Sequence, residues 1–152
     1  MKNISVWKNA SHLFFLLLLV FTVGYVGSAF MTPTTWDWYN SLAKSPLNPP
    51  DFIFPIVWTI LLFLQAIAAF LVWGKASPRW FVAQLMFNML WSFTFFYLHS
   101  PSISFIVSLL FSCALFINTY TFGKVNKIAG LLILPTFLWS LFAIYLNAYL
   151  VF

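Results

Sequence analysis

The chain has 152 residues, of which 63 % are hydrophobic and 6 % are charged. Because a soluble domain carries about 25 % charged residues, this composition excludes an ordinary water-soluble globule and indicates an integral membrane protein. The net charge of +5 comes from basic residues that are too few and too scattered to form a phosphate-binding surface, so nucleic acid is not an expected partner.

The single cysteine, Cys113, excludes an intrachain disulfide. The two histidines, His12 and His99, have no acidic or thiol companions, whereas a metal site needs three or four ligands. We therefore expect neither a bound metal nor a cofactor.

Five apolar stretches have the length of a membrane-crossing helix. They cover residues 13–31, 52–73, 78–98, 101–122 and 127 to near the C-terminus. The predicted fold class is an all-α integral membrane protein, a bundle of five transmembrane helices in a single domain that spans residues 1–152. Most of the connections are short, so neighbouring helices are expected to run antiparallel.

Helix start and stop signals support these bounds. Ser77-Pro78 and Ser100-Pro101 each combine an N-cap with a proline at the first helical position. Asn126 suits the N-cap of the last helix and Asp51 that of the second, while Gly123 suits a helix C-cap.

The first connection, residues 32–51, is much longer than the others and holds both acids of the chain, Asp37 and Asp51. Five of the eight prolines lie in it or beside it: Pro33, Pro46, Pro49, Pro50 and Pro55. Because proline fixes φ and removes a backbone donor, we interpret this segment as a stiff, irregular loop outside the hydrocarbon.

The basic residues are distributed asymmetrically about the expected membrane. Six of the seven fall on three segments that share one side of a five-span chain: Lys2, Lys8, Lys75, Arg79, Lys124 and Lys127. Lys44 alone lies on the opposite side. The positive-inside rule therefore predicts a multi-pass protein whose N-terminus is cytoplasmic and whose long loop is external.

No Asp, Glu, Lys or Arg lies deep in any of the five stretches. Proton-driven transporters usually keep an intramembrane ionisable group. Hydrolases that use paired carboxylates or a serine triad need a buried acid. Both classes are therefore disfavoured.

Amides and tryptophans recur at helical spacing within the stretches, which places them on inward faces. The sets are Trp58 with Gln65, Gln84 with Asn88 and Trp91, and Trp139 with Ala143 and Asn147. One interpretation is hydrogen bonding between helices. The other is a flat-walled aromatic pocket for a planar apolar ligand, lined by Trp58, Trp91 and Trp139 together with Asn88.

Several motifs occur in the order found in one known family. They are Trp38-Tyr39, Leu42, Lys44, Pro49-Pro50 and Pro55-x-x-Trp58-Thr59, then Asn88-x-x-Trp91-Ser92 with Phe95-Phe96, then Pro135, Trp139, Phe142-Ala143 and Asn147. With these motifs the chain resembles the TspO family, the tryptophan-rich sensory proteins related to the mitochondrial translocator protein. The resemblance extends over nearly the whole chain.

The resemblance implies a five-helix bundle, commonly a homodimer, surrounded by membrane lipid, and a bacterial cell membrane is the expected location. It implies a pocket under the first loop that binds porphyrins or other tetrapyrroles, sterols or benzodiazepine-type drugs. The ligand-binding residues that carry over by motif are Tyr39, Trp58, Asn88, Trp91, Trp139 and Ala143. Small residues such as Gly24 and Ser28 give weak further support for a dimer.

The sequence departs from the family pattern at three positions. Ser45 follows Lys44 where a proline is usual, Thr136 replaces a tyrosine, and Ser108 stands where an acid is often found. The last two changes remove polar groups, so we expect ligand choice to differ from that of relatives.

Three functions compete. The leading hypothesis is a membrane receptor or sensor for porphyrins and similar hydrophobic ligands. The first alternative is an enzyme that degrades protoporphyrin with light and oxygen, in which Trp58 and Trp139 are the catalytic candidates as oxidisable indoles. The second alternative is a tetrapyrrole transporter, which the absence of intramembrane charge disfavours.

Overall fold

The computed structural model describes the backbone of residues 2–152 and the side chains of residues 10–152. Over these residues the chain is helical and has no strand, as predicted. The helices are α1 (Lys2–Ser28), α2 (Pro33–Ser41), α3 (Ile53–Leu71), α4 (Arg79–Ser92), α5 (Pro101–Val125) and α6 (Lys127–Tyr149), with a π-helical turn, η1 (Phe93–Tyr97), directly after α4. The side chains of Lys2, Trp7 and Lys8 lie outside the described residues.

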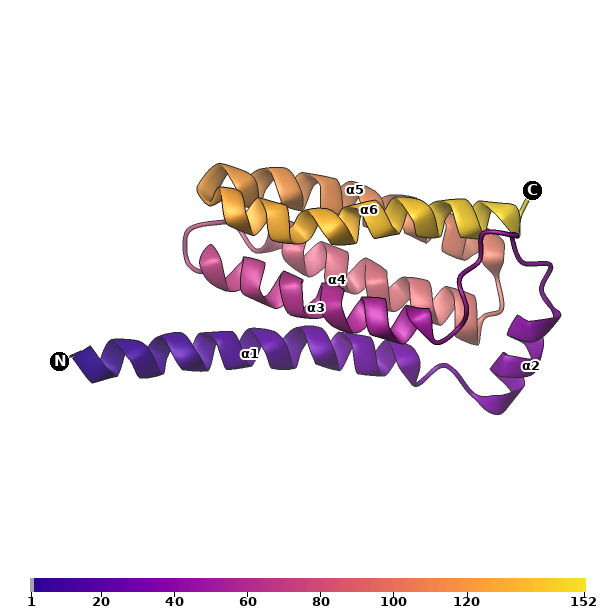
Figure 1. Cartoon of the computed structure of the whole chain (residues 1–152), viewed down its shortest axis with the longest axis horizontal. Coiled ribbons are helices and arrows are strands. Elements are labelled where there is room, and N and C mark those ends of the chain that lie inside the picture. The colour runs from indigo at the N-terminus through magenta and orange to yellow at the C-terminus, as the bar shows by residue number, and fades with distance from the viewer. Residues whose placement is uncertain (1) are drawn as a thin grey trace.

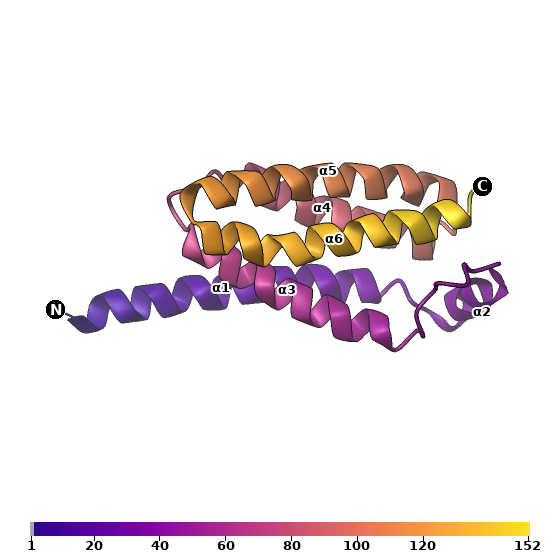
Figure 2. The same cartoon turned by 45° about the horizontal axis from the view of Figure 1, so that its top comes forward.

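The five longer helices lie side by side and alternate in direction (Figure 1). They pack as a ring in the order α1, α3, α6, α5, α4 and back to α1. The short helix α2 lies beyond the ends of the other helices, at the end of the bundle that also holds the C-terminus, and Figure 2 shows α1 and α3 crossing at an angle. The antiparallel arrangement predicted from the short connections is confirmed.

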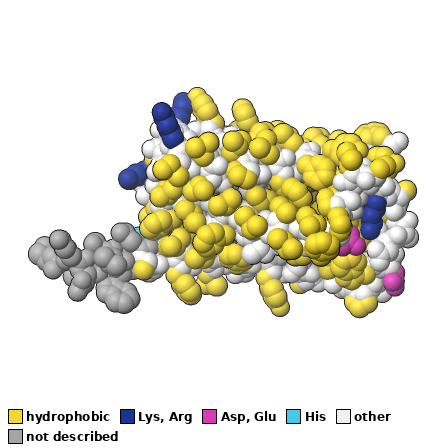
Figure 3. Space-filling model, in the orientation of Figure 1, with side chains coloured by type: hydrophobic (Ala, Val, Ile, Leu, Met, Phe, Trp, Pro, Cys, Tyr) yellow, Lys and Arg dark blue, Asp and Glu magenta, His cyan; other side chains and the backbone are white. Residues whose placement is uncertain are grey.

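Within the part of the chain that the structure describes, four helices are long and apolar enough to cross a membrane. These candidate spans are Ala10–Ser28, Ile53–Leu71, Pro101–Val125 and Lys127–Tyr149. The regular α4 is shorter because it passes into η1 at Phe93. The five spans expected from the sequence are therefore not confirmed by length and composition. On the face seen in Figure 3, apolar side chains cover most of the surface between the two ends, as a lipid-facing surface requires.

The helix signals were read correctly at two of the positions. Asn126 caps α6, because its Oδ1 accepts hydrogen bonds from the backbone N–H groups of Ile128 at 2.9 Å and Ala129 at 3.3 Å. Helix α5 begins at Pro101, directly after Ser100, as the serine–proline pair predicts.

Three other signals were misread. Helix α4 begins at Arg79 and not at Pro78, and its N-cap residue is Pro78, without a side-chain cap, in place of Ser77. Asp51 is not the N-cap of α3, which follows Phe52 without a side-chain cap, because the Asp51 carboxylate is engaged by Lys44 and Tyr39 instead. Gly123 is not a C-cap, since α5 continues to Val125. Its backbone instead lies close to that of Gly130 on α6.

The connection between α1 and α3, residues 29–52, is called the lid below. The expectation of a wholly irregular loop is wrong, because residues Pro33–Ser41 form α2. Thr32 caps this helix by accepting from the Thr35 backbone N–H, and Pro33 takes the first turn. This is the same signal as at Ser100-Pro101, so the sequence contained it.

Buried amides close the half of the bundle that is farther from the lid. Gln84 on α4 donates from Nε2 to Gln65 Oε1 on α3 at 2.9 Å, and Asn118 on α5 donates from Nδ2 to Gln84 Oε1 at 3.0 Å. All three side chains are buried. Hydrogen bonds of this kind contribute about 0.6 kcal/mol each on average, and here they join three helices at one level.

The face containing Gly24 also packs within the chain. A Cβ added at Gly24 would meet Leu62 Cδ1 of α3 at 2.7 Å. The small residue therefore permits the contact between α1 and α3, and it gives no support for a dimer.

Gly130→Ala is expected to destabilise the protein, because its Cβ would lie 2.7 Å from Gly123 Cα and 3.0 Å from the Thr119 carbonyl oxygen. Overpacking of this kind costs about 1–3 kcal/mol. The matched control is Gly123→Ala, whose Cβ would lie an ordinary 3.8 Å from Gly130 Cα. Thermal unfolding in detergent should give a lower Tm for Gly130→Ala only. Equal losses in both variants would mean that close α5–α6 contact is not the cause.

Candidate functional site

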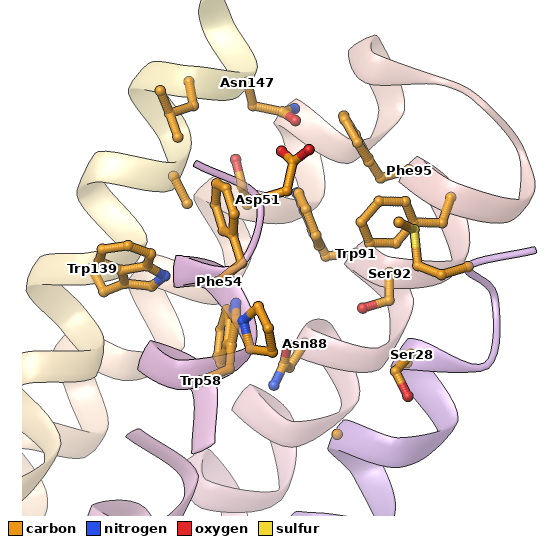
Figure 4. Close-up of a pocket in the computed structure, with 18 of the residues that line it drawn as sticks. Ser28, Asp51, Phe54, Trp58, Asn88, Trp91, Ser92, Phe95, Trp139 and Asn147 are labelled. Atoms are coloured by element: carbon orange, nitrogen blue, oxygen red, sulfur yellow. The ribbon is translucent and has the colours of Figure 1, made fainter. Parts of the chain in front are cut away.

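A cavity of about 800 Å³ occupies the half of the bundle nearer the lid. All five long helices contribute to its wall, and the lid covers it. Figure 4 shows Trp58 and Trp139 on its α3 and α6 sides and Asn88 and Trp91 on its α4 side. The six residues predicted as ligand contacts all line this one cavity: Tyr39, Trp58, Asn88, Trp91, Trp139 and Ala143.

Aromatic contacts hold the tryptophan rings of the wall in place. Trp91 stacks on Phe95 with ring centroids 5.0 Å apart and planes 8° apart. Trp139 contacts Phe54 across the α3–α6 boundary at 6.1 Å, and Trp58 contacts Phe111 of α5 at 6.3 Å. These rings give the cavity flat apolar faces whose positions are fixed before any ligand arrives.

Some of the inward amides form hydrogen bonds between helices and others line the cavity, so both interpretations of the sequence apply. Gln65 and Gln84 join helices, as described above. Asn88 lines the cavity, and no hydrogen bond of its side chain is found among the described residues. Asn147 has both roles, because it donates to α5 and also lines the cavity.

The charged groups of the site lie in the lid. Lys44 Nζ is 3.6 Å from the centre of the Tyr39 ring and 3.9 Å from Asp51 Oδ1. The Tyr39 hydroxyl donates to the same carboxylate oxygen at 3.2 Å. Burial of the phenol raises the pKa of Tyr39; an interaction with Asn48 opposes this effect, and the nearby Asp51 charge adds to it. The hydroxyl is therefore protonated well beyond neutral pH and acts as a donor.

Helix α2 is attached to the bundle through the π-turn. The Thr35 hydroxyl lies 3.1 Å from the Phe30 carbonyl oxygen and 3.3 Å from that of Phe96, so its one proton is shared between the two acceptors. Trp38 stacks on His99 at 4.3 Å and meets the edge of Phe95 at 5.3 Å. Phe95 also contacts Trp91 in the wall, so lid and wall share one aromatic cluster.

Ser45, one of the departures from the family pattern, fastens the other part of the lid. Its hydroxyl is 2.9 Å from the Tyr145 hydroxyl on α6, and it accepts from the Leu47 backbone N–H at 3.2 Å. A proline at this position has no hydroxyl and could not make this contact. Ser108 also lines the cavity, but its hydroxyl donates to the Phe105 carbonyl at 2.7 Å. Thr136 is buried and does not line the cavity.

Sequence reasoning missed several residues of the cavity. Lys44, Asn48 and Asp51 of the lid line it, as do Phe54 and Ser140 of the wall. Asp51 was misread as a helix cap. Asn147 has the four-residue spacing from Trp139 and Ala143 that marks the inward face, so the same periodicity could have assigned it to the cavity.

Fold and site together define a helical membrane protein with an apolar, aromatic cavity under a folded lid. Residues 15–152 match the TspO/MBR family. The tryptophan-rich protein TspO of Chlorobaculum tepidum is 37 % identical, with 85 % of this chain and 87 % of the relative covered. The tryptophan-rich sensory protein of Cereibacter sphaeroides is 33 % identical, with 73 % of each chain covered. The translocator protein of Ovis aries is 26 % identical, with 82 % and 79 % covered.

The chain therefore belongs to the TspO/MBR family, and the resemblance stated from its motifs is confirmed.

Tyr145→Phe is expected to loosen the lid, because it removes the hydrogen bond to Ser45 and leaves the ring. If the lost hydrogen bond contributes about 1 kcal/mol to the closed state, the population of the open lid rises roughly fivefold. Hydrogen–deuterium exchange of a peptide containing the Asn48 amide, which donates to the Ser45 carbonyl at 2.9 Å, measures this. Tyr149→Phe, one turn further along α6, is the control. Unchanged exchange in Tyr145→Phe would show that this contact does not hold the lid.

Proposed function

We propose that the protein is a membrane receptor or sensor that binds a planar hydrophobic ligand of the tetrapyrrole class in the cavity under the lid. The observation that carries this proposal is the cavity of about 800 Å³ with Trp58, Trp91, Trp139 and Asn88 in its wall. Its volume falls within the range of about 300–1,000 Å³ found for small-molecule sites. Sterols and benzodiazepine-type drugs are further candidate ligands because they too are largely apolar.

The chemistry of the wall supports a flat, mostly apolar ligand. Indole faces offer stacking area, and aromatic pairs contribute about 0.5–1.5 kcal/mol beyond burial. Asn88 supplies a polar contact on the α4 side. Lys44 lines the cavity from the lid, so a ligand with peripheral carboxylates would meet this charge at the edge of the cavity. Asp51 partly neutralises Lys44 in the absence of ligand.

We further propose that α4 and η1 together form a fifth membrane span. They follow one another without a break and together have the length of α3. Lys75 lies in the α3–α4 connection, while Arg79, Lys124 and Lys127 lie in the helix turns that border this and the α5–α6 connection. Lys44 lies in the lid. Figure 3 shows Lys and Arg side chains toward the two ends of the molecule, with apolar side chains between them. With five spans, the positive-inside rule favours a cytoplasmic N-terminus and an external lid.

Impermeant thiol labelling in intact cells tests this orientation. Cys113 is first replaced by Ser, because it is exposed on the helix surface. A cysteine at Leu47, which is exposed in the lid, should be labelled readily. One at Ser77, exposed in the α3–α4 connection, should be labelled only after the cells are opened. The reverse pattern would overturn the orientation.

The first alternative to a receptor is an enzyme that degrades porphyrin. Two indoles that line the cavity, Trp58 and Trp139, support this alternative. Illumination of the protein with protoporphyrin under oxygen separates an enzyme from a receptor, because only an enzyme bleaches the pigment faster than detergent alone does.

The second alternative is a tetrapyrrole transporter, whose cavity would have to open in turn to each side of the membrane. The homodimer implied by the resemblance stays a prediction.

Trp139→Phe is expected to weaken protoporphyrin binding by several-fold to tenfold, because it removes the indole N–H and part of the stacking area. An aromatic ring still fills most of the volume, so the Tm without ligand should change little. The control is Trp80→Phe at the start of α4, outside the cavity. Both are measured by tryptophan-quenching titration and by melting curves. Equal affinity in the two variants would contradict the assignment of Trp139 to the ligand site.

A further inference from the structure

Two buried polar atoms in the cavity wall have no hydrogen-bond partner among the described residues. They are Nε1 of Trp91 on α4 and Oδ1 of Asn147 on α6. Asn147 is 2 % exposed. Figure 4 shows both side chains at the cavity, where they project from two different helices. Because buried polar groups are nearly always paired, these two atoms mark places where the wall is chemically incomplete, in addition to the less buried Asn88 amide.

The orientation of the Asn147 amide is fixed by its neighbours on α5. Its Nδ2 donates to the Pro101 carbonyl oxygen at 2.9 Å and to Ser104 Oγ at 3.3 Å. A carbonyl oxygen can only accept, so it requires the NH₂ group. The Ser104 hydroxyl lies 2.9 Å from the Ser100 carbonyl, to which it donates, and so it offers only its lone pairs to Asn147. Rotating the amide would lose both contacts, and Oδ1 is therefore held as an acceptor.

The indole N–H of Trp91 is fixed in a similar way. The ring stacks on Phe95 and meets the edge of Phe96 at 5.7 Å and 86°. An indole N–H is a donor only. The cavity therefore carries one fixed donor and one fixed acceptor in a wall that is otherwise mainly aromatic and aliphatic.

We propose that Asn147 is a specificity-determining residue of the cavity, whose Oδ1 accepts a hydrogen bond from an N–H or O–H group of the ligand while Trp91 donates to a ligand acceptor. This inference rests on the proposed function, and it narrows the ligand class to planar apolar molecules that carry both a donor and an acceptor, as lactams and other secondary amides do. A purely hydrocarbon ligand would leave both atoms unpaired, so it should bind less well than its size suggests.

A pair of matched probes tests the role of Asn147. Phenanthridin-6(5H)-one is a planar lactam with one N–H and one carbonyl, and its N-methyl derivative keeps the carbonyl but carries a methyl group in place of the donor hydrogen. Wild-type protein should bind the N–H lactam about three- to tenfold more tightly than the N-methyl lactam, the worth of one hydrogen bond. In Asn147→Leu this preference should fall to about onefold, because the acceptor is gone.

Two further variants separate this role from a structural one. Ser104→Ala removes a partner of the Asn147 NH₂ group but leaves Oδ1, so the preference should persist. Asn88→Leu removes the other amide of the wall, and it should lower both affinities while the preference stays. If the preference disappears in Asn88→Leu, or persists in Asn147→Leu, the proposal is overturned. Should Asn147→Leu fail to fold, a preference lost in Asn88→Leu would still overturn the proposal.

Protoporphyrin binding, measured in parallel, distinguishes failure of the proposed function from failure of the role assigned to Asn147. If wild-type protein binds neither protoporphyrin nor either lactam, the proposed function itself fails. If it binds protoporphyrin but does not distinguish the lactams, or binds neither of them, only the role of Asn147 is overturned.

Discussion

The bilayer supplies no hydrogen-bond partners, and this constraint determines how the interior of the bundle is arranged. A polar side chain within the hydrocarbon must be satisfied by the protein itself. Far from the lid, Gln65, Gln84 and Asn118 satisfy much of one another's hydrogen-bonding capacity and so draw α3, α4 and α5 together. Nearer the lid no such cross-links join α3 to α4 among the described residues. There a cavity lies between the helices in place of a closely packed core.

The cavity then depends on elements that close it without filling it. Helix α2 packs on the π-turn, where the Thr35 hydroxyl contacts the Phe96 carbonyl oxygen and Trp38 stacks on His99. Ser45 fastens the following segment to Tyr145 on α6. The α5–α6 pair is held along its length by the Gly123–Gly130 contact, by the Ser112 and Ser140 hydroxyls, and by Asn147. The rigid pair and the docked lid thus frame a preformed site, which lowers the entropy cost of binding.

Much of this arrangement could be predicted from the sequence, because helical periodicity and cap chemistry are local. Spacings of three, four and seven residues placed Trp58, Asn88, Trp91, Trp139 and Ala143 on inward faces, and motif order added Tyr39. Periodicity could not separate Gln84 from Asn88, which share a face, because only the packing of α3 decides which amide meets Gln65 and which meets open space. The pairing of Ser45 with Tyr145 joins residues far apart in sequence and left no local signal. Helix α2 was missed although Thr32-Pro33 carried its start signal.

The central claim is that a planar pigment binds inside the bundle and not on its outer surface. A crystal structure of the protein with protoporphyrin tests it most directly. We expect electron density for the macrocycle between Trp58, Asn88 and Trp139, with the lid closed above it. Density confined to the outer groove between α3 and α6, lined by Val57, Leu61 and Pro135, would contradict it.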